Sequence, residues 1–243
     1  MSKVYVVGIG PGNYENFTIK ADSILQKCDV LVGYTVYVDL IKELYPNKEF
    51  LSTPMTQEVE RCQRAIDMAL DGKTVAVICS GDSGIYGMAS LIYELRGSSL
   101  IPEIEVVPGL TAACSGAAII GAPLTHDFAV ISLSDRLTSW DKIKSRLIYA
   151  AKADLSIVLY NPASKGRPMH LKNACEVLLQ ELPSDRICAI AKHIGREGEA
   201  KRILTLSELM HTAVDMFCTV FIGNSSTKRI EEVMITPRGY KNV

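Results

Sequence analysis

Several short turns, most of which contain glycine, follow apolar runs of this 243-residue sequence, and polar side chains stand at their tips. The first turn is VGIGPG, and the others cover residues 80–82, 108–111, 160–162 and 223–225. Glycine lets a ligand approach the backbone closely, and exposed peptide N–H groups can hold its polar atoms. Because ligands of parallel sheets bind outside the carboxyl ends of the strands, this set predicts a site for a polar small molecule.

The opening turn does not fit the dinucleotide-binding pattern, which needs glycines at its first, third and sixth places. Asn13 stands at the sixth place, and Pro11 lies where a helix should begin. No lysine of the P-loop kind follows any of the turns, so a nucleoside triphosphate is disfavoured. The seven cysteines contain no CxxC pair and no zinc spacing. We therefore expect reduced, mostly buried thiols and no metal site.

Short apolar runs alternate with helical spacing along the chain. The pattern predicts strands over residues 4–9, 30–32, 74–79, 104–107, 129–133, 156–159, 186–191 and 219–222. It predicts helices over residues 56–71, with Thr56 as the cap and Gly72 at the end, and over residues 141–151 and 170–181. This alternation predicts an α/β fold of two α/β domains, residues 1–121 and 122–243, with mainly parallel sheets and an interdomain cleft.

The overall composition argues against several classes of partner. A formal net charge of −1 offers no general attraction to nucleic acid or to an anionic membrane. The longest apolar stretch has 15 residues from Leu110, is interrupted by Ser and Gly, and is too short to span a bilayer. The first residues lack the basic start and long apolar core of a signal peptide. We therefore expect a cytoplasmic protein that acts on a small molecule.

Several segments together resemble the tetrapyrrole methyltransferases: VGIGPG, CSGDSGIYGMA, VVPGLTAA, GAPLTHDFAVISLSD, LYNPASKGR and MITPRGY. The resemblance covers nearly the whole chain. HDFAVISLSD, LYNPASKGR and the spacing of Gly33, Tyr34 and Tyr37 resemble more closely the branch that methylates C17 of precorrin-3B or cobalt-factor III, with ring contraction, in cobalamin biosynthesis. The resemblance implies a homodimer of two-domain chains that binds S-adenosylmethionine (SAM) in the cleft between the domains.

The resemblance also implies which residues contact SAM. By their positions in the matching segments, they are Pro11, Ser80, Gly81, Asp82, Ile85, Thr111, Ala112, Tyr160, Asn161 and, in the less similar segment KHIGREG, Gly195. SAM carries no phosphate, which agrees with the lack of a phosphate-binding loop. The family's usual GGDP loop reads SGDS here, with Ser80 and Ser83 in place of Gly and Pro.

The ring contraction implied by the resemblance moves protons, so it needs acid–base groups. The catalytic candidates are His126, Asp135 and Tyr160, which lie in the most distinctive segment or in the turn that we expect to face it. Histidine titrates near neutral pH and can both accept and donate a proton. The simpler interpretation is that His126 and Asp135 only cap turns.

The implied substrate carries several carboxylates, which Arg and Lys bind as charge-assisted pairs. Lys165 and Arg167 form one local basic cluster, and Lys192 and Arg196 belong to another. The alternative for both clusters is a solvated charged surface. Two other functions stay open: another corrin or sirohaem-pathway methyltransferase, and a protein that binds SAM or a tetrapyrrole without turnover. The presence of cobalt in the substrate is also left open by the sequence.

Overall fold

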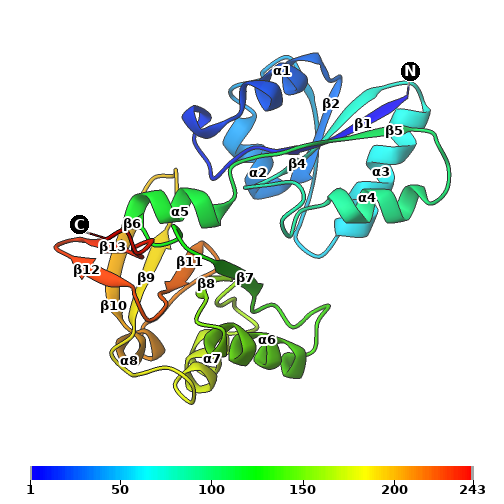
Figure 1. The fold of residues 1–243 in the computed structure, drawn as a ribbon. Coiled ribbons are helices and arrows are strands. Elements are labelled where there is room, and N and C mark those ends of the chain that lie inside the picture. Colours follow the sequence, from blue (N-terminus) through cyan, green and yellow to red (C-terminus); the bar gives the residue numbers. More distant parts are fainter. Residues whose placement is uncertain (1, 242–243) are drawn as a thin grey trace. The chain divides into compact units, whose positions relative to one another are not determined.

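The computed structural model describes residues 2–241, and its α/β chain forms two compact units, Met1–Ala112 and Ala113–Val243 (Figure 1). The sequence predicts a boundary after Gly121, whereas the chain passes from the first unit to the second between Ala112 and Ala113. The segment between these two points therefore belongs to the second unit.

Packing explains why this segment joins the second unit. Helix α5 (Ala112–Ile120) lies so close to that unit's core that a Cβ added to Gly116 would be 2.9 Å from the ring of Phe221. Strand β6 (Gly121–Ala122) then pairs in parallel with β13 (Val233–Ile235), near the end of the chain. A boundary at residue 121 would break both associations.

The first unit contains a five-stranded sheet in which every pairing is parallel. Residues on these strands are buried on both faces, as a parallel sheet covered by helices requires. Val6, for example, pairs with Val77 on one side and with Val106 on the other. The order across the sheet is β3 (Glu49–Thr53), β2 (Val30–Tyr34), β4 (Thr74–Cys79), β1 (Lys3–Gly8) and β5 (Glu103–Val107).

Helices cover both faces of this sheet (Figure 1). Helix α3 buries Cys62, Ala65, Ile66 and Ala69, whereas Val59 and Leu70, which belong to the apolar spacing that predicts this helix, are exposed. Helices α3 (Glu58–Leu70) and α4 (Ala89–Arg96) contribute to one hydrophobic cluster, and α1 (Ile19–Lys27) and α2 (Thr35–Ile41) to the other. A short 3-10 turn, Tyr14–Asn16, precedes α1.

The two ends of α3 test the predicted capping residues. Gly72 ends the helix with a φ of 93°, as expected. The prediction that Thr56 caps the start is wrong, because Gln57 occupies the cap position and Thr56 has a φ of 75°. The backbone N–H of Thr56 instead donates to the carboxylate of Glu58, 3.1 Å away.

The second unit has a mixed five-stranded sheet, so the expectation of mainly parallel sheets is correct for the first unit and wrong for the second. Only β7 and β8 pair in parallel. The connection from β9 to β10 covers residues 193–199, which is too short for the crossover that parallel strands need. The order is β10 (Ala200–Thr205), β9 (Ile187–Lys192), β11 (Cys218–Ile222), β8 (Ser156–Tyr160) and β7 (Phe128–Ser132).

Three helices pack on one face of this mixed sheet, and α5 packs on the other. The three are α6 (Trp140–Lys152), α7 (His170–Leu178) and α8 (Leu206–Met210). Strands β12 (Lys228–Ile230), β13 and β6 form a small third sheet. In residues 2–241, no helix is long and apolar enough to cross a membrane.

The cysteines are free thiols, and all except Cys114 are buried. Burial raises the pKa of Cys62 and of Cys218 to about 11. These two thiols are therefore protonated and unreactive near neutral pH, as the sequence leads us to expect.

Gly33 provides a test of the packing in the first unit. A Cβ at this position of β2 would lie 2.4 Å from Cγ1 of Ile78, a side chain that is itself buried. We expect Gly33→Ala to destabilise the protein by about 1–3 kcal/mol through overpacking. The control is Gly166→Ala, because nothing lies within 4 Å of its added Cβ. Thermal unfolding midpoints measure both, and equal midpoints for the two variants would contradict the packing.

Candidate functional site

Three turns meet at the carboxyl edge of the first unit's sheet with their backbones in direct contact. Gly10 donates its N–H to the carbonyl of Gly81 at 3.0 Å, and Gly81 returns the bond at 2.7 Å. A Cβ on Gly8 would lie 2.6 Å from the nitrogen of Gly109, and one on Gly109 would lie 2.2 Å from the oxygen of Gly81. Backbone atoms cannot move aside as side chains do, so only glycine fits at these contacts.

Asp82 holds this arrangement together. Its Oδ1 accepts the N–H groups of Gly84 and Ile85, at 2.7 and 2.9 Å, and its Oδ2 accepts the N–H of Gly109 at 2.9 Å. A carboxylate offers about four acceptor positions, so at most one further donor could bind it. Asp82 therefore shapes the loop after β4 and ties it to the turn after β5.

Ser83 adds a second tie between the same two segments. Its side chain is fully buried, and its hydroxyl donates to the carbonyl of Val107 at 2.8 Å. A proline at this position, as in the usual loop of the family, could not make this bond. The SGDS variant of the loop thus has a structural role of its own.

The predicted SAM contacts of the first unit come together at this edge, because β4, β1 and β5 are neighbours in the sheet. Ile85 presents an apolar side chain that is 42% exposed, while Thr111 is buried. The residues are Pro11 after β1, Ser80, Gly81, Asp82 and Ile85 after β4, and Thr111 and Ala112 after β5.

In the second unit, β7 and β8 also end side by side, and polar side chains link the segments that follow them. The side-chain amide of Asn161 donates to Oγ of Ser132 at 2.9 Å, and Asn161 has a φ of 54°. The hydroxyl of Tyr160 accepts the N–H of Ala113, in the first turn of α5, at 2.6 Å. Tyr160 and Asn161 thus lie on one edge, beside the end of β7.

Beyond the ends of the strands, Arg167 and Asp135 form a second connection between the loops that follow β7 and β8. Nη1 of Arg167 lies 2.6 Å from Oγ of Ser134 and 3.4 Å from Oδ1 of Asp135, and its Nε donates to Oγ of Ser164 at 3.3 Å. Arg167, predicted as a substrate contact, therefore joins the loop after β7 to the loop after β8.

His170, the first residue of α7, is a member of this cluster that the sequence did not single out. Its Nε2 lies 3.1 Å from Oδ2 of Asp135, the distance of an ion pair, although the two groups are not aligned for a linear hydrogen bond. Its ring stands edge-on to Trp140, with ring centres 5.2 Å apart. No motif in the sequence marks His170, since its partner Asp135 lies on another element.

The charge state of Asp135 follows from these neighbours. Burial alone would favour its neutral form, but His170 and Arg167 outweigh this effect and hold the pKa of Asp135 below its ordinary value. Asp135 is therefore a carboxylate near neutral pH. In that form it can accept a proton or hold a cation, and it has no proton to donate.

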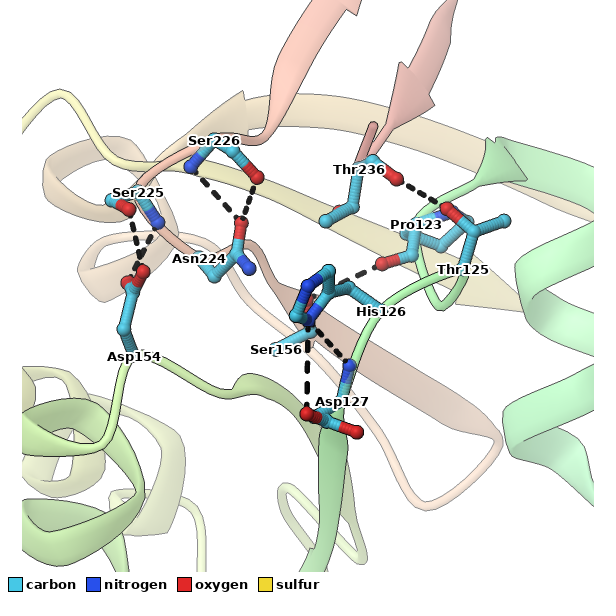
Figure 2. Close-up of polar contacts among 10 residues, drawn as sticks. All are labelled: Pro123, Thr125, His126, Asp127, Asp154, Ser156, Asn224, Ser225, Ser226 and Thr236. Atoms are coloured by element: carbon cyan, nitrogen blue, oxygen red, sulfur yellow. Dashed lines mark hydrogen bonds and ion pairs between the residues drawn. The ribbon is translucent and has the colours of Figure 1, made fainter. Parts of the chain in front are cut away.

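The structure does not bring His126 to Tyr160 and Asp135. His126 precedes β7 and Asp135 follows it, and a five-residue strand spans roughly 13 Å. Figure 2 shows the surroundings of His126, where its Nδ1 accepts the N–H of Asp127 at 2.9 Å. The ring of His126 is thus hydrogen-bonded to the backbone just before β7.

The turn at residues 223–225 lies at the same end of the sheet as His126, because β11 runs antiparallel to β8. There the backbone N–H of Ser225 donates to Asp154 at 2.8 Å, and Oδ1 of Asn224 accepts from Ser226 (Figure 2). This turn is therefore not part of the edge that carries Tyr160.

Among residues 2–241, no group of three or more His, Cys, Asp and Glu could hold a metal ion.

Of the remaining predicted residues, Lys192 ends β9, Gly195 and Arg196 follow it, and the carboxyl end of β9 lies at the same edge as that of β8. Lys192 pairs with Asp215 at 2.9 Å, and the guanidinium of Arg196 lies 5.6 Å from the ring centre of Phe217. The N–H of Gly195 donates to Glu199 at 2.7 Å. Lys165 is exposed in the loop after β8.

The bonds of Asp82 lead to a prediction about stability. Asp82→Ala leaves three backbone N–H groups without their acceptor, and one of them, on Gly109, is partly buried. We expect a loss of about 1–3 kcal/mol in the free energy of unfolding, measured by urea denaturation. The control is Asp39→Ala, which removes only a surface ion pair with Lys42 and should cost less than about 1 kcal/mol. Equal losses in the two variants would contradict the structural role of Asp82.

Comparisons with known proteins agree with this architecture. The family model of tetrapyrrole (corrin/porphyrin) methylases matches residues 3–210. A probable cobalt-factor III C(17)-methyltransferase of Salmonella typhimurium is 43% identical, over 97% of this chain and 98% of that protein. A precorrin-3B C(17)-methyltransferase of Sinorhizobium sp is 36% identical, over 98% of this chain and 96% of its own.

Two further relatives complete the comparison. The cobalt-factor III methyltransferase of Priestia megaterium is 42% identical over 98% of this chain, which spans only 45% of that protein. The crystal structure of the methyltransferase CobJ superposes with a TM-score of 0.91 at 33% identity, covering 98% of this chain and all of that one. On the match of the family model and the near full-length identities, this chain belongs to the tetrapyrrole (corrin/porphyrin) methylase family.

Proposed function

We propose that this protein is a SAM-dependent methyltransferase that methylates C17 of precorrin-3B or cobalt-factor III, with contraction of the ring, in cobalamin biosynthesis. The observation that carries the proposal is the near full-length identity to two relatives that are both named as C17-methyltransferases. One of these names specifies a cobalt-containing substrate and the other does not, so both substrates stay in the proposal.

The residues at the edge of the first unit's sheet fit SAM as a ligand. The glycine contacts bring three turns together at this edge, and the exposed part of Ile85 beside them offers apolar surface to an adenine ring. The absence of a phosphate-binding lysine suits a cofactor without phosphate. When bound, SAM supplies an electrophilic methyl group. The turns would orient it, and orientation is a large part of catalysis in such a reaction.

Asp135 and Tyr160 are the groups of this chain that we propose to handle protons. Asp135 is ionised near neutral pH and is held by Arg167 and His170, so it is available as an acceptor. Tyr160 lies on the same edge, tied by its hydroxyl to Ala113. His126, at the other end of β7, is the remaining candidate. Its position favours the capping interpretation.

We further propose a cytoplasmic homodimer. The state of the thiols supports this location, since the cysteines are free and nearly all of them are buried. The dimer rests on the resemblance to the family. Sedimentation velocity measures the mass of the particle directly, and a monomer at micromolar concentration would contradict it.

The function is tested by anaerobic incubation of the protein and SAM with metal-free precorrin-3B and, separately, with cobalt-factor III. From at least one substrate, we expect a ring-contracted product that carries one additional methyl group. S-adenosylhomocysteine should form in an equal amount. Mass spectrometry gives the stoichiometry, and NMR of a product with a ¹³C-labelled methyl group gives the position. Methylation at another carbon supports a different corrin methyltransferase, and binding without turnover supports a carrier. Either result overturns the proposal.

A pair of variants distinguishes between the two candidate proton-transfer residues at the ends of β7, Asp135 and His126. Asp135→Asn should slow ring contraction by about 10²–10⁴-fold, the usual effect of losing a proton-transfer group. His126→Ala should keep most of the activity and lose about 1 kcal/mol of stability, the cost of a lost cap. Single-turnover kinetics and denaturation curves measure both, and SAM affinity should be unchanged in each variant. A slow His126→Ala together with an active Asp135→Asn would reverse the assignment.

A further inference from the structure

A groove of about 670 Å³ opens in the second unit between two loops. One wall is the loop after β8, which continues into α7, and the other is the segment of residues 211–217 that leads into β11. Because β11 runs antiparallel to β8 and β9, its start lies at the edge where those two strands end. The groove is therefore on the same edge as Tyr160 and Asn161.

The floor of the groove is apolar and partly exposed to water. Met169 is 49% exposed, Met216 37% and Phe217 36%, and Met210 and Leu171 also line it. Apolar side chains gathered in a concave surface mark a binding site more often than scattered exposed ones do. Methionine is flexible and polarizable, so it adapts to the surface of a flat ring.

Cations surround this apolar floor. Lys165 and Lys172 line the groove directly, and Lys165 makes no ion pair with another residue of the range 2–241. Lys192 is held at the groove by Asp215, and Arg196 by the ring of Phe217. Two basic clusters that are well separated in the sequence thus converge on one surface.

The acidic residue that lines the groove does not cancel this charge. Asp215 is the one carboxylate among the lining residues, and Lys192 lies 2.9 Å from it. The pair is neutral as a whole, which leaves Lys165 and Lys172 to attract anions. Lys172 shares its charge only loosely with Glu176, at 4.0 Å.

From this combination we infer that the groove binds part of the tetrapyrrole substrate, with the macrocycle against Met169, Met216 and Phe217 and its carboxylate side chains at Lys165 and Lys172. The inference rests on the proposed function for the identity of the substrate. The volume of the groove is that of a small-molecule site, whereas a stable protein partner needs about 1,000 Å² of buried surface. Charge and apolar surface together match a flat ring that carries carboxylates.

The test uses the full-length protein and variants at the groove. Met216→Glu places a negative charge on the apolar floor and should raise the KM for the tetrapyrrole about tenfold or more. Lys165→Ala should raise it about 2- to 5-fold, because the lost ion pair is exposed. For both variants, kcat at saturating substrate and the Kd of SAM should stay within about twofold of the wild type.

Two controls carry the same chemical changes away from the groove. Ile230→Glu alters an exposed apolar residue of β12, and Lys144→Ala removes an exposed cation from α6. Neither should change the KM. Circular dichroism melting of every variant shows whether it is folded, and Lys165→Ala still tests the inference if Met216→Glu does not fold.

A second measurement does not depend on turnover. Hydrogen exchange of residues 163–172 and 211–217 should slow when the metal-free substrate is added without SAM. If the wild type turns over and neither the KM of the groove variants nor this exchange changes, the groove inference is wrong and the proposed function stands. If the wild type shows neither binding nor turnover of any tetrapyrrole, the proposed function itself fails.

Discussion

The contact among the backbones of Gly8, Gly81 and Gly109 is the constraint on which the candidate site of the first unit depends. A side chain at Gly8 or Gly109 would strike peptide atoms that have nowhere to move. Because the three turns touch, the carboxylate of Asp82 reaches across to Gly109 and fixes the loop after β4. Close backbone packing at these glycines thus fixes where the three turns lie relative to one another.

In the second unit, the directions of the strands decide which groups can act together. In the parallel pair β7 and β8, Tyr160 ends β8 at the edge where Asp135 follows β7, and His126 lies at the other end of the sheet. Strand β11 runs antiparallel to β8, so the segment before β11 lies at the edge where β7 and β8 end. The turn after β11 lies at the opposite end of the sheet. A carboxylate, a phenol and an apolar groove are assembled in this way from distant parts of the chain.

The charges at this edge are mostly paired within the protein. Asp135 is held by Arg167 and His170, and Lys192 is held by Asp215. Arg167 therefore links the loop after β7 to the loop after β8. Lys165 is the cation there with no such ion pair in residues 2–241. A substrate with several carboxylates would meet a scaffold that is already ordered, which lowers the entropy cost of binding.

Periodicity and turn residues in the sequence were enough to predict the long helices, the buried strands and the α/β class, because these depend on neighbours a few residues apart. They did not reveal the edge strand β3, the cap at Gln57 or the association of α5 with the second unit. The similarity of motifs identified the family and predicts which turns contact its cofactor. Only the tertiary structure decided which turns share an edge and that His170 faces Asp135. The physical reason is that these juxtapositions depend on strand direction and sheet order, which join residues far apart in the chain and leave no local pattern.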